Sequence, residues 1–300
     1  MKLITPRTAT AFLAATTVVA SFGLTAGASA PPDKDALTLV QDASTSVAGA
    51  SMRFDVAMDL TGAPISFGDG PLMTGAAAGT SVEMSIDLGA IFEAGGIDPT
   101  MFGIDDASMQ LRVLDGTDVY VRGGLFALVG QLDPSFTQFA ALGDGWGHVD
   151  ANQVPDFDQL ISEMSGAGNP TEALTVLDAV QSAEIVGTED IDGETMTVVR
   201  ITVSGAELEK ITGPDNPFAG ADITVPYDLY IDAAGYPRQM VINLDSETLS
   251  AADEENAFDG MAISMTMTMR FFDYHDESIV IEAPADAIDV TADFITMSAA

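Results

Sequence analysis

Residues 223–282 decide the fold, because hydrophobic and polar residues alternate through three consecutive runs of this stretch. The first run reads ITVPYDLYID over residues 223–232, and AAG at 233–235 predicts the turn that ends it. The second run carries Met240, Ile242 and Leu244, and the third reads MAISMTMTMRF over residues 261–271. Successive side chains of a strand point to opposite faces, so each run predicts one apolar and one polar face. Three such runs joined by turns predict an antiparallel sheet with one apolar side.

The same alternation recurs upstream and predicts a sheet of about nine to eleven strands. The further runs fall at residues 52–60, 81–88, 109–113, 119–121, 146–150, 183–189, 195–203 and 278–282. Apolar residues at helical spacing predict helices over residues 33–48, ended by Gly49, and over residues 170–180, with shorter ones at 156–164 and 205–211. Many strands with few helices indicate an α+β fold.

Two segments break the alternation and carry aromatic and aliphatic residues among glycines and prolines. They span residues 89–104 and 123–142. Segments of this kind either fold over a core or rim the mouth of a cavity, and we favour core cover because apolar residues usually pack.

The N-terminal 30 residues predict a cleaved secretory signal peptide. They carry Lys2 and Arg7, no acid, and an apolar run over residues 11–24 before the small residues Ala28-Ser29-Ala30. Cleavage after Ala30 would place a proline first, so cleavage after Ala28 is a second option. An uncleaved membrane anchor is less favoured, because the apolar run is short for a span. We expect a secreted or cell-envelope protein whose mature part, residues 31–300, is a single domain without a transmembrane span.

The chain has no cysteine and a net charge of −36, which becomes −38 once the two basic residues of the signal are removed. Disulfides, thiolate metal sites and a lipid-modified cysteine are therefore excluded. Nucleic acid and anionic membrane surfaces are poor partners for such a negative field. Six arginines lie inside predicted strands and are expected to pair with carboxylates across the polar face: Arg53, Arg112, Arg122, Arg200, Arg238 and Arg270.

The sequence shows no catalytic motif. It contains two histidines, His148 and His275, and neither a G-x-S-x-G elbow nor an H-E-x-x-H motif. Each histidine is expected to be an ordinary surface or hydrogen-bonded residue. The acidic residues 253–260 lack the spacing of an EF-hand loop, so a solvated loop is favoured over a calcium site. A hydrolase built on two carboxylates remains a weaker alternative, and we expect no enzyme and no cofactor.

A sheet with one apolar side exposes more apolar area than two or three helices can cover, so it is expected to curl. Its interior would then be filled by its own side chains, by a second sheet or by a ligand. The methionines of residues 261–271 suit a pocket for flexible acyl chains, and they equally suit a large core. Both interpretations stay open at this point.

Four segments together resemble the actinobacterial LppX/LprG-type lipoprotein family. They read SMRFDVAMDL at 51–60, EIVGTEDIDG at 184–193, VPYDLYIDAAG at 225–235 followed by Pro237-Arg238, and IEAP at 281–284. The resemblance spans nearly the whole mature chain and implies a strongly curved antiparallel half-barrel, with LolA-like helices covering its concave face. It also implies a hydrophobic cavity for an acylated lipid or glycolipid. The lipid-anchored cysteine of the family is missing here.

The apolar rows quoted above match the concave face of that family and are the candidate ligand-binding residues. They are Phe54, Val56, Met58, Val82, Met84, Ile86, Leu88, Leu111, Tyr227, Leu229, Ile231, Met240, Ile242, Ile263, Met265, Met267 and Met269. We therefore expect an exported, non-enzymatic binding protein for an acyl-chain lipid or glycolipid, with a role in envelope lipid transport. The alternative is a structural or sensory surface domain of the same fold whose core is filled by its own side chains.

Overall fold

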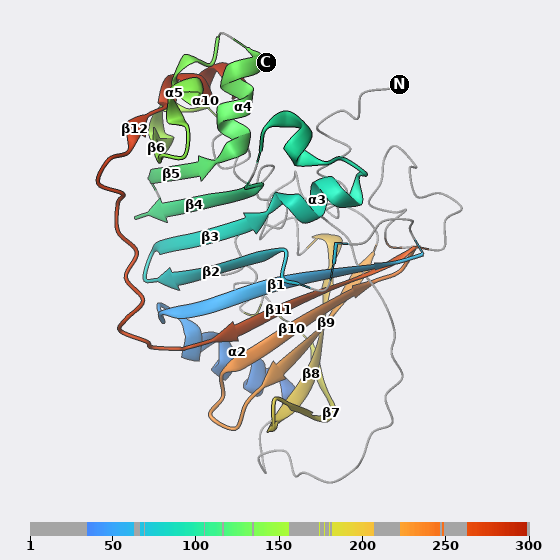
Figure 1. Cartoon of the computed structure of the whole chain (residues 1–300). Coiled ribbons are helices and arrows are strands. Elements are labelled where there is room, and N and C mark those ends of the chain that lie inside the picture. The colour runs from blue at the N-terminus through green and yellow to red at the C-terminus, as the bar shows by residue number, and fades with distance from the viewer. Residues whose placement is uncertain are drawn as a thin grey trace. The chain divides into compact units, whose positions relative to one another are not determined.

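The computed structural model describes residues 35–62, 67–68, 70–104, 106–115, 117–133, 135–155, 174, 177, 180, 182–206, 223–246, 248 and 263–298. Twelve strands form one sheet in the order β12-β6-β5-β4-β3-β2-β1-β11-β10-β9-β8-β7 (Figure 1). The described pairings are antiparallel, except the parallel pair of β12 and β6. The order ends at β12 and β7, so the sheet is open. The predicted α+β class with a large antiparallel sheet is confirmed.

The chain divides into two compact units, and each is described by itself. Unit 1 comprises Met1–Ala48, Val56–Pro64 and Gly166–Phe272, and unit 2 comprises Gly49–Asp55, Ile65–Ser165 and Asp273–Ala300. Strand β1, Met52–Thr61, therefore begins in unit 2 and ends in unit 1. That residues 31–300 form a single domain stays a prediction.

Unit 1 begins with helix α2, Ala36–Val47, close to the predicted bounds. Asp35 caps it, since its Oδ1 accepts a hydrogen bond of 2.8 Å from the Thr38 amide. Gly49 follows the helix with a φ of 70°, a conformation that glycine adopts at little cost. The buried stripe of α2 includes Leu39, Val40 and Ala43, and the helix contacts β7.

The three runs of residues 223–282 form adjacent strands of unit 1, as predicted. They are β9 (Thr224–Ile231), β10 (Pro237–Leu244) and β11 (Ser264–Phe272). Strands β8 (Glu194–Ser204) and β7 (Ala183–Ile191) follow β9 in the sheet. Asp192 and Gly193, with φ of 51° and 86°, make the predicted tight turn between β7 and β8. In the β9–β10 turn, Asp232 accepts hydrogen bonds from the amides of Ala234 and Tyr236.

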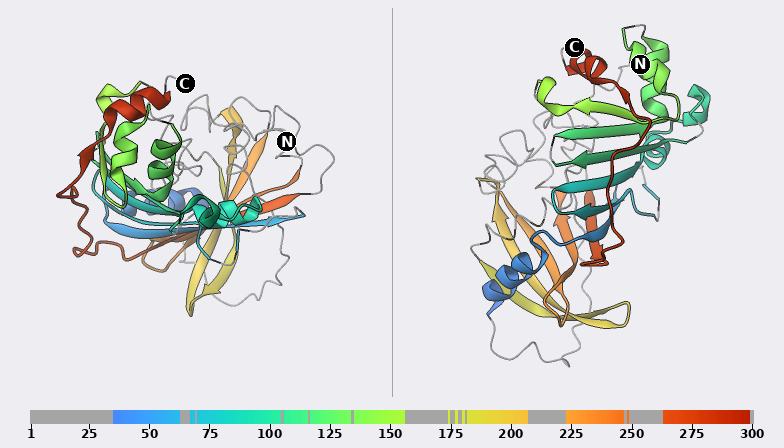
Figure 2. Two further views of the ribbon diagram at one scale, coloured as in Figure 1. Left: turned by 45° about the horizontal axis from the view of Figure 1, so that its top comes forward. Right: turned by 90° about the vertical axis from the view of Figure 1, so that its left-hand side faces the viewer.

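Unit 2 contains the other part of the sheet and most of the described helices (Figure 2). Its strands are β2 (Met73–Ala78), β3 (Ser81–Asp87), β4 (Ser108–Leu114), β5 (Asp118–Gly123), β6 (Gly147–Asp150) and β12 (Ile288–Asp289). Its helices are α3 (Leu88–Ala94), η1 (Pro99–Phe102), α4 (Gly124–Leu132), α5 (Thr137–Leu142), η2 (Ala151–Gln153) and α10 (Thr291–Ser298).

Helices α4, α5 and α10 fill the core of unit 2. The rings of Phe126, Phe139 and Phe294 are all buried, and their centroids lie 5.3 to 6.0 Å apart. A Cβ atom on Gly147 would lie 2.7 Å from Val290, so the chain packs closely against β6 where α10 begins. The predicted core cover by residues 123–142 is thus confirmed for Phe126, Phe139 and Leu142, whereas Leu132 is 73% exposed.

Core cover is wrong for part of the other apolar segment, residues 89–104. Met101 is 80% exposed and Ile97 is 41% exposed. Met101 lies in η1, which Asp98 caps by accepting from the amide and hydroxyl of Thr100. Only Ile104 at its end is fully buried among the residues that the structure describes here.

Three strand predictions need correction. Leu88 does not continue β3, because the Asp87 carboxylate accepts from the Ala90 amide and caps α3 at that point. Strand β2 was missed, since its Gly75 and alanines carry no strand signal. Residues 278–282 form no strand, because the Ile279 amide turns back to Asp276 and the Glu282 carbonyl accepts from the Arg112 guanidinium.

Several predicted segments lie outside the described residues. These are the signal peptide at 1–30, the helix at 156–164, most of 170–180 and 205–211, and the acidic loop at 253–260. Leu174, Leu177 and Val180 of the second predicted helix are described and buried. Within the described ranges, no helix has the length and apolar character needed to cross a bilayer.

Candidate functional site

The candidate site of unit 1 is one apolar face of strands β8 to β11. Strand register places Met269 beside Met240, Met240 beside Leu229, and Leu229 beside Val199. One step along the strands, the register joins a second row across the same face. We call this the middle row, and it consists of Met267, Ile242, Tyr227 and Ile201.

Three members of the middle row are less completely buried than the residues on either side of it, whereas the fourth, Ile201, keeps 0% of its surface. Met267 and Tyr227 each keep 7% of their surface, and Ile242 is partly exposed. Met240 keeps 0% on one side, and Met265 and Leu244 keep 2% each on the other. Accessible surface therefore remains inside the apolar face, between two buried rows, rather than at its rim.

The opposite face of the same strands is polar. The Arg200 guanidinium donates two hydrogen bonds of 2.7 Å to the Asp228 carboxylate. The Tyr230 hydroxyl donates to Glu189 Oε2 at 3.3 Å, and burial, followed by the charge of Glu189, raises the pKa of Tyr230 to about 12. An exposed pair of this kind stabilises a fold by at most ~1 kcal/mol. Polar side chains on this face therefore bind one another across neighbouring strands.

Tyr227 differs from Tyr230, although both lie on β9. Its side chain is buried, and register places it between Ile242 and Ile201. Burial raises the pKa of Tyr227 well above its ordinary value, so the phenol keeps its proton. It is a neutral hydrogen-bond donor inside an otherwise apolar face.

The structure divides the predicted ligand-binding residues between the two units. In unit 1 lie Val56, Met58, Tyr227, Leu229, Ile231, Met240, Ile242, Ile263, Met265, Met267 and Met269, and all but Ile242 keep 7% of their surface or less. In unit 2 lie Phe54, Val82, Met84, Ile86, Leu88 and Leu111, and all but Leu88 are fully buried. Their contact with a ligand stays a prediction.

Sequence reasoning missed several members of the unit 1 face, among them Val199, Ile201 and Leu244. Leu244 was part of a quoted run but was not chosen as a site residue. Val199 and Ile201 lie on β8, where the adjacent buried Val198 and Val199 obscure the period of two. The alternation Val199, Ile201 and Val203 was the available signal.

Within unit 2, register places Gly75 beside Met84, Met84 beside Leu111, and Leu111 beside Val121. A Cβ on Gly75 would lie 2.3 Å from the ring of Phe54, so that ring covers the glycine. At the β6 end, Leu142 and Val290 cover Gly147. The chain's own side chains thus fill this face at both ends.

Unit 2 also has a cleft of about 550 Å³ with a mixed polar and apolar lining, between α3, η1 and the ends of β3 and β4. Its acids include Asp87, Asp98 and Asp106, and each accepts a hydrogen bond from a nearby backbone amide. The hydrogen bond from the Thr100 hydroxyl is the main cause that lowers the pKa of Asp98, and the Ser108 amide does the same for Asp106. These carboxylates cap local turns and helices, and the described residues contain no cluster suited to a metal ion.

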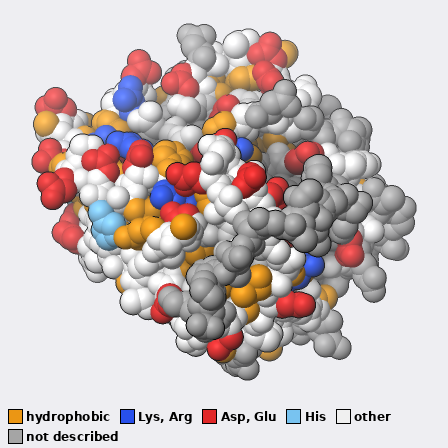
Figure 3. Space-filling model, turned by 90° about the horizontal axis from the view of Figure 1, so that it is seen from below, with side chains coloured by type: hydrophobic (Ala, Val, Ile, Leu, Met, Phe, Trp, Pro, Cys, Tyr) orange, Lys and Arg blue, Asp and Glu red, His pale blue; other side chains and the backbone are white. Residues whose placement is uncertain are grey.

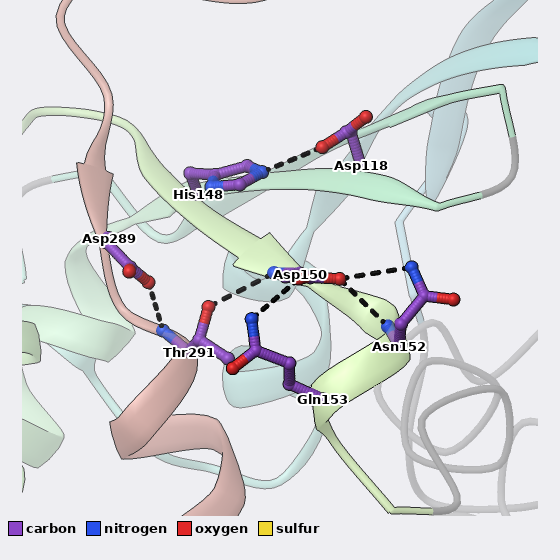
Figure 4. A network of polar contacts seen from close by, with 7 residues as sticks. All are labelled: Asp118, His148, Asp150, Asn152, Gln153, Asp289 and Thr291. Atoms are coloured by element: carbon purple, nitrogen blue, oxygen red, sulfur yellow. Dashed lines mark hydrogen bonds and ion pairs between the residues drawn. The ribbon is translucent and has the colours of Figure 1, made fainter.

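His148 lies in a polar network that joins β5, β6 and β12 (Figure 4). Its Nε2 lies 3.0 Å from Asp118 Oδ1, and its ring lies 5.0 Å from that of Tyr120. The Asp150 carboxylate accepts from Gln153 and Asn152, and the Gln153 bond is the main cause that lowers its pKa. The network links β5, β6 and the segment after β12 at one edge of the sheet. The expectation of an ordinary hydrogen-bonded histidine fits this geometry.

His275 is exposed in a turn with a φ of 59°, and its amide donates to the Ser51 carbonyl. Ion pairs between described residues join Arg53 with Asp273, Arg112 with Glu83, Arg200 with Asp228 and Arg238 with Asp232, as predicted for these arginines. Acidic side chains are spread over the face shown in Figure 3 rather than gathered in one place.

Comparison with known proteins supports the resemblance seen in the sequence. The family model of the LppX_LprAFG lipoproteins matches residues 135–270. A comparison with curated protein sequences finds no match.

Three solved structures illustrate the similarity. The lipoprotein LppX of Mycobacterium tuberculosis is 16% identical, with a TM-score of 0.43 over 82% of this chain and 98% of that chain. LprF from Mycobacterium bovis is 15% identical, with a TM-score of 0.45 over 86% and 100%. A LolA superfamily protein from Nitrosomonas europaea is 9% identical, with a TM-score of 0.26 over 83% and 96%. Over residues 135–270, slightly less than half of its length, the chain is similar to the LppX_LprAFG lipoprotein family.

Proposed function

We propose that this protein is an exported, non-enzymatic carrier that binds an acyl-chain lipid or glycolipid on the apolar face of unit 1. The observation that carries the proposal is the middle row, where Met267, Ile242 and Tyr227 keep accessible surface between two buried rows. Methionine side chains are flexible and polarisable, so they adapt to an irregular hydrocarbon partner. Each ligand methylene buried there would contribute ~0.8 kcal/mol.

The family match supports the same class of function. The matching model is named for lipoproteins, and its residues 135–270 include β8 to β10 and most of β11. Transport of lipid through the cell envelope would fit the signal-like residues 1–30 and the strongly acidic composition. A carrier needs no catalytic group, which suits the capped carboxylates and the structural role of the His148 network.

A second candidate is a structural or sensory domain whose core is filled by its own side chains. The aromatic cluster of Phe126, Phe139 and Phe294 favours it for unit 2. We therefore place the ligand in unit 1 and keep Met84 and Leu111 of unit 2 as less favoured lining residues.

Lipid that co-purifies with the protein tests the proposal. The full chain is exported by a native-like host, purified without detergent and extracted with organic solvent, and the extract is analysed by mass spectrometry. We expect about one equivalent of an acyl lipid per chain, since long chains bound this way are held firmly. A matched sample that is unfolded, washed and refolded should lose this lipid and take it up again. Absence of lipid from both samples, with no uptake of added lipid, would favour the structural domain.

A further inference from the structure

A short segment of unit 2, between α3 and the end of η1, holds large apolar side chains in solvent. Met101 is 80% exposed and Ile97 is 41% exposed. Local hydrogen bonds fix the backbone here, since the Ile97 amide donates to the Phe92 carbonyl at 2.8 Å and the Met101 amide donates to the Asp98 carbonyl at 3.1 Å. The exposure of Met101 is therefore built into an ordered segment, and exposed apolar groups of this kind often mark an interaction site.

The cleft of about 550 Å³ lies directly beside this segment, because Pro99 and Thr100 of η1 line it. Its lining includes two buried apolar residues, Leu72 and Ile104, which keep 4% of their surface each. It also includes four exposed acids, Asp87, Glu93, Asp98 and Asp106. Neither lysine nor arginine occurs among the described residues that line the cleft. An acidic recess and exposed apolar side chains thus adjoin on one surface.

The carboxylates of the cleft keep capacity for a further donor. In Asp87, Asp98 and Asp106, the hydrogen bonds from backbone amides all end on Oδ1. A carboxylate can accept about four hydrogen bonds, so these bonds do not saturate it. The Ser108 amide is the main cause that lowers the pKa of Asp106, and the charge of Arg122 is the smallest. The acids therefore stay ionised at neutral pH and can bind a cation.

Charge and geometry together indicate what would cover this surface. A second copy of the chain, with a net charge of −36, would bring more negative charge to an acidic recess. A small cation would fill the cleft but leave Met101 and Ile97 in water, since neither residue lines it. A peptide segment that carries lysine or arginine next to an apolar residue matches both parts.

We propose that the cleft and the exposed side chains of Met101 and Ile97 form a docking surface for a basic segment of a partner protein. Lysine or arginine side chains of the partner pair with the carboxylates of the cleft, and an apolar side chain packs on Met101. The docking surface belongs to unit 2 and does not depend on the lipid site proposed for unit 1.

The test measures the fluorescence anisotropy of a short labelled peptide of alternating lysine and leucine that is titrated with the full protein. We expect saturable binding that weakens as salt is added. Met101→Ser should weaken binding about tenfold, since apolar burial is lost, and Glu93→Gln about threefold, since one exposed ion pair is lost. The matched controls are Leu132→Ser and Asp286→Asn, because both residues are exposed in unit 2 and lie outside the cleft lining. Both controls should bind like wild type.

A second peptide, with serine in place of leucine, separates docking from general charge attraction. It should bind wild type at least about fivefold more weakly, and Met101→Ser should not change its affinity. Equal binding of the two peptides, controls that lose as much affinity as Met101→Ser and Glu93→Gln, or no binding to wild type would each overturn the docking surface. Self-association of wild type that Met101→Ser abolishes would assign the surface to a second copy instead. These results leave the lipid site untouched, because extraction of bound lipid tests it separately.

Discussion

The apolar faces of the two units follow the same alternation but are completed differently. In unit 2, the face of β2 to β6 is covered by side chains of the same unit, from the Phe54 ring over Gly75 to Val290 against Gly147. In unit 1, the face of β8 to β11 keeps accessible surface in its middle row, where Ile242 is only partly buried. Alternation therefore predicts that a face must be covered, and only packing shows whether the protein itself completes the cover.

A buried acid, Asp293, shows that the packed helices of unit 2 also satisfy one another's polar groups. Asp293 of α10 is buried, and its Oδ2 accepts a hydrogen bond of 2.7 Å from the Phe139 amide in the first turn of α5. Helix α5 has no side-chain cap of its own, so the carboxylate from α10 takes that role. These helices thus share both a hydrogen bond and aromatic packing, as expected of a core rather than of a binding cavity.

Phe139→Ala should give the largest effect, because it empties the centre of the aromatic cluster in unit 2. We expect the free energy of unfolding to fall by about 3–5 kcal/mol, the range typical of a buried phenylalanine. Denaturant titration followed by circular dichroism measures it. Leu132→Ala is the control, since Leu132 is 73% exposed on α4 and should change stability by less than about 0.5 kcal/mol. Similar losses for both variants would show that the cluster is not the core of unit 2.

A pair of tryptophan substitutions compares the two faces directly. Met84→Trp overfills the packed face of unit 2 and should cost ~1–3 kcal/mol of unfolding free energy. Met267→Trp enters the middle row of unit 1, where accessible surface remains, and should cost markedly less. Chemical denaturation of both variants decides the point. Equal destabilisation would mean that the two faces are packed alike.

Alternation predicted the strands of residues 223–282 and the apolar rows on them, because a period of two is visible in the residues themselves. It could not predict β2, because Gly75 of this strand has no side chain to show the alternation. Gly75 pairs with Met84 of β3 and is covered by the ring of Phe54 from β1. Alternation also missed the switch at Leu88, although Asp87 before LGAIF is a readable cap signal.

The candidate site was predictable only as a set of apolar residues. The placement of Tyr227 between Ile242 and Ile201 depends on the strand register. Register is set by long-range pairing, which one sequence does not reveal. The exposure of Met101 was equally hidden, because hydrophobicity alone does not say which apolar residues a fold leaves outside.

The smallest expected effect concerns pH and the edge of unit 2 shown in Figure 4. Hydrogen bonds from the Thr291 side chain and amide lower the pKa of Asp289 below its ordinary value of 3.8. A lowered pKa in the folded protein adds stability above that value, which is lost as the pH falls through the folded pKa. Asp289→Asn should therefore be less stable than wild type near neutral pH, and the difference should shrink below about pH 4. Urea unfolding across this range measures it, and a difference that grows on acidification would show that Asp289 does not stabilise β12 as an anion.

Titration of a fluorescent long-chain fatty acid into wild type and Met267→Trp tests the central claim most directly. The carrier hypothesis predicts saturable binding to wild type and binding weakened at least about tenfold in Met267→Trp, since the indole would occupy the space of the acyl chain. It also predicts that Met267→Trp keeps the melting temperature of wild type within the error of the measurement. Absence of binding to wild type, or a Met267→Trp variant that binds normally, would contradict a ligand site on the apolar face of unit 1.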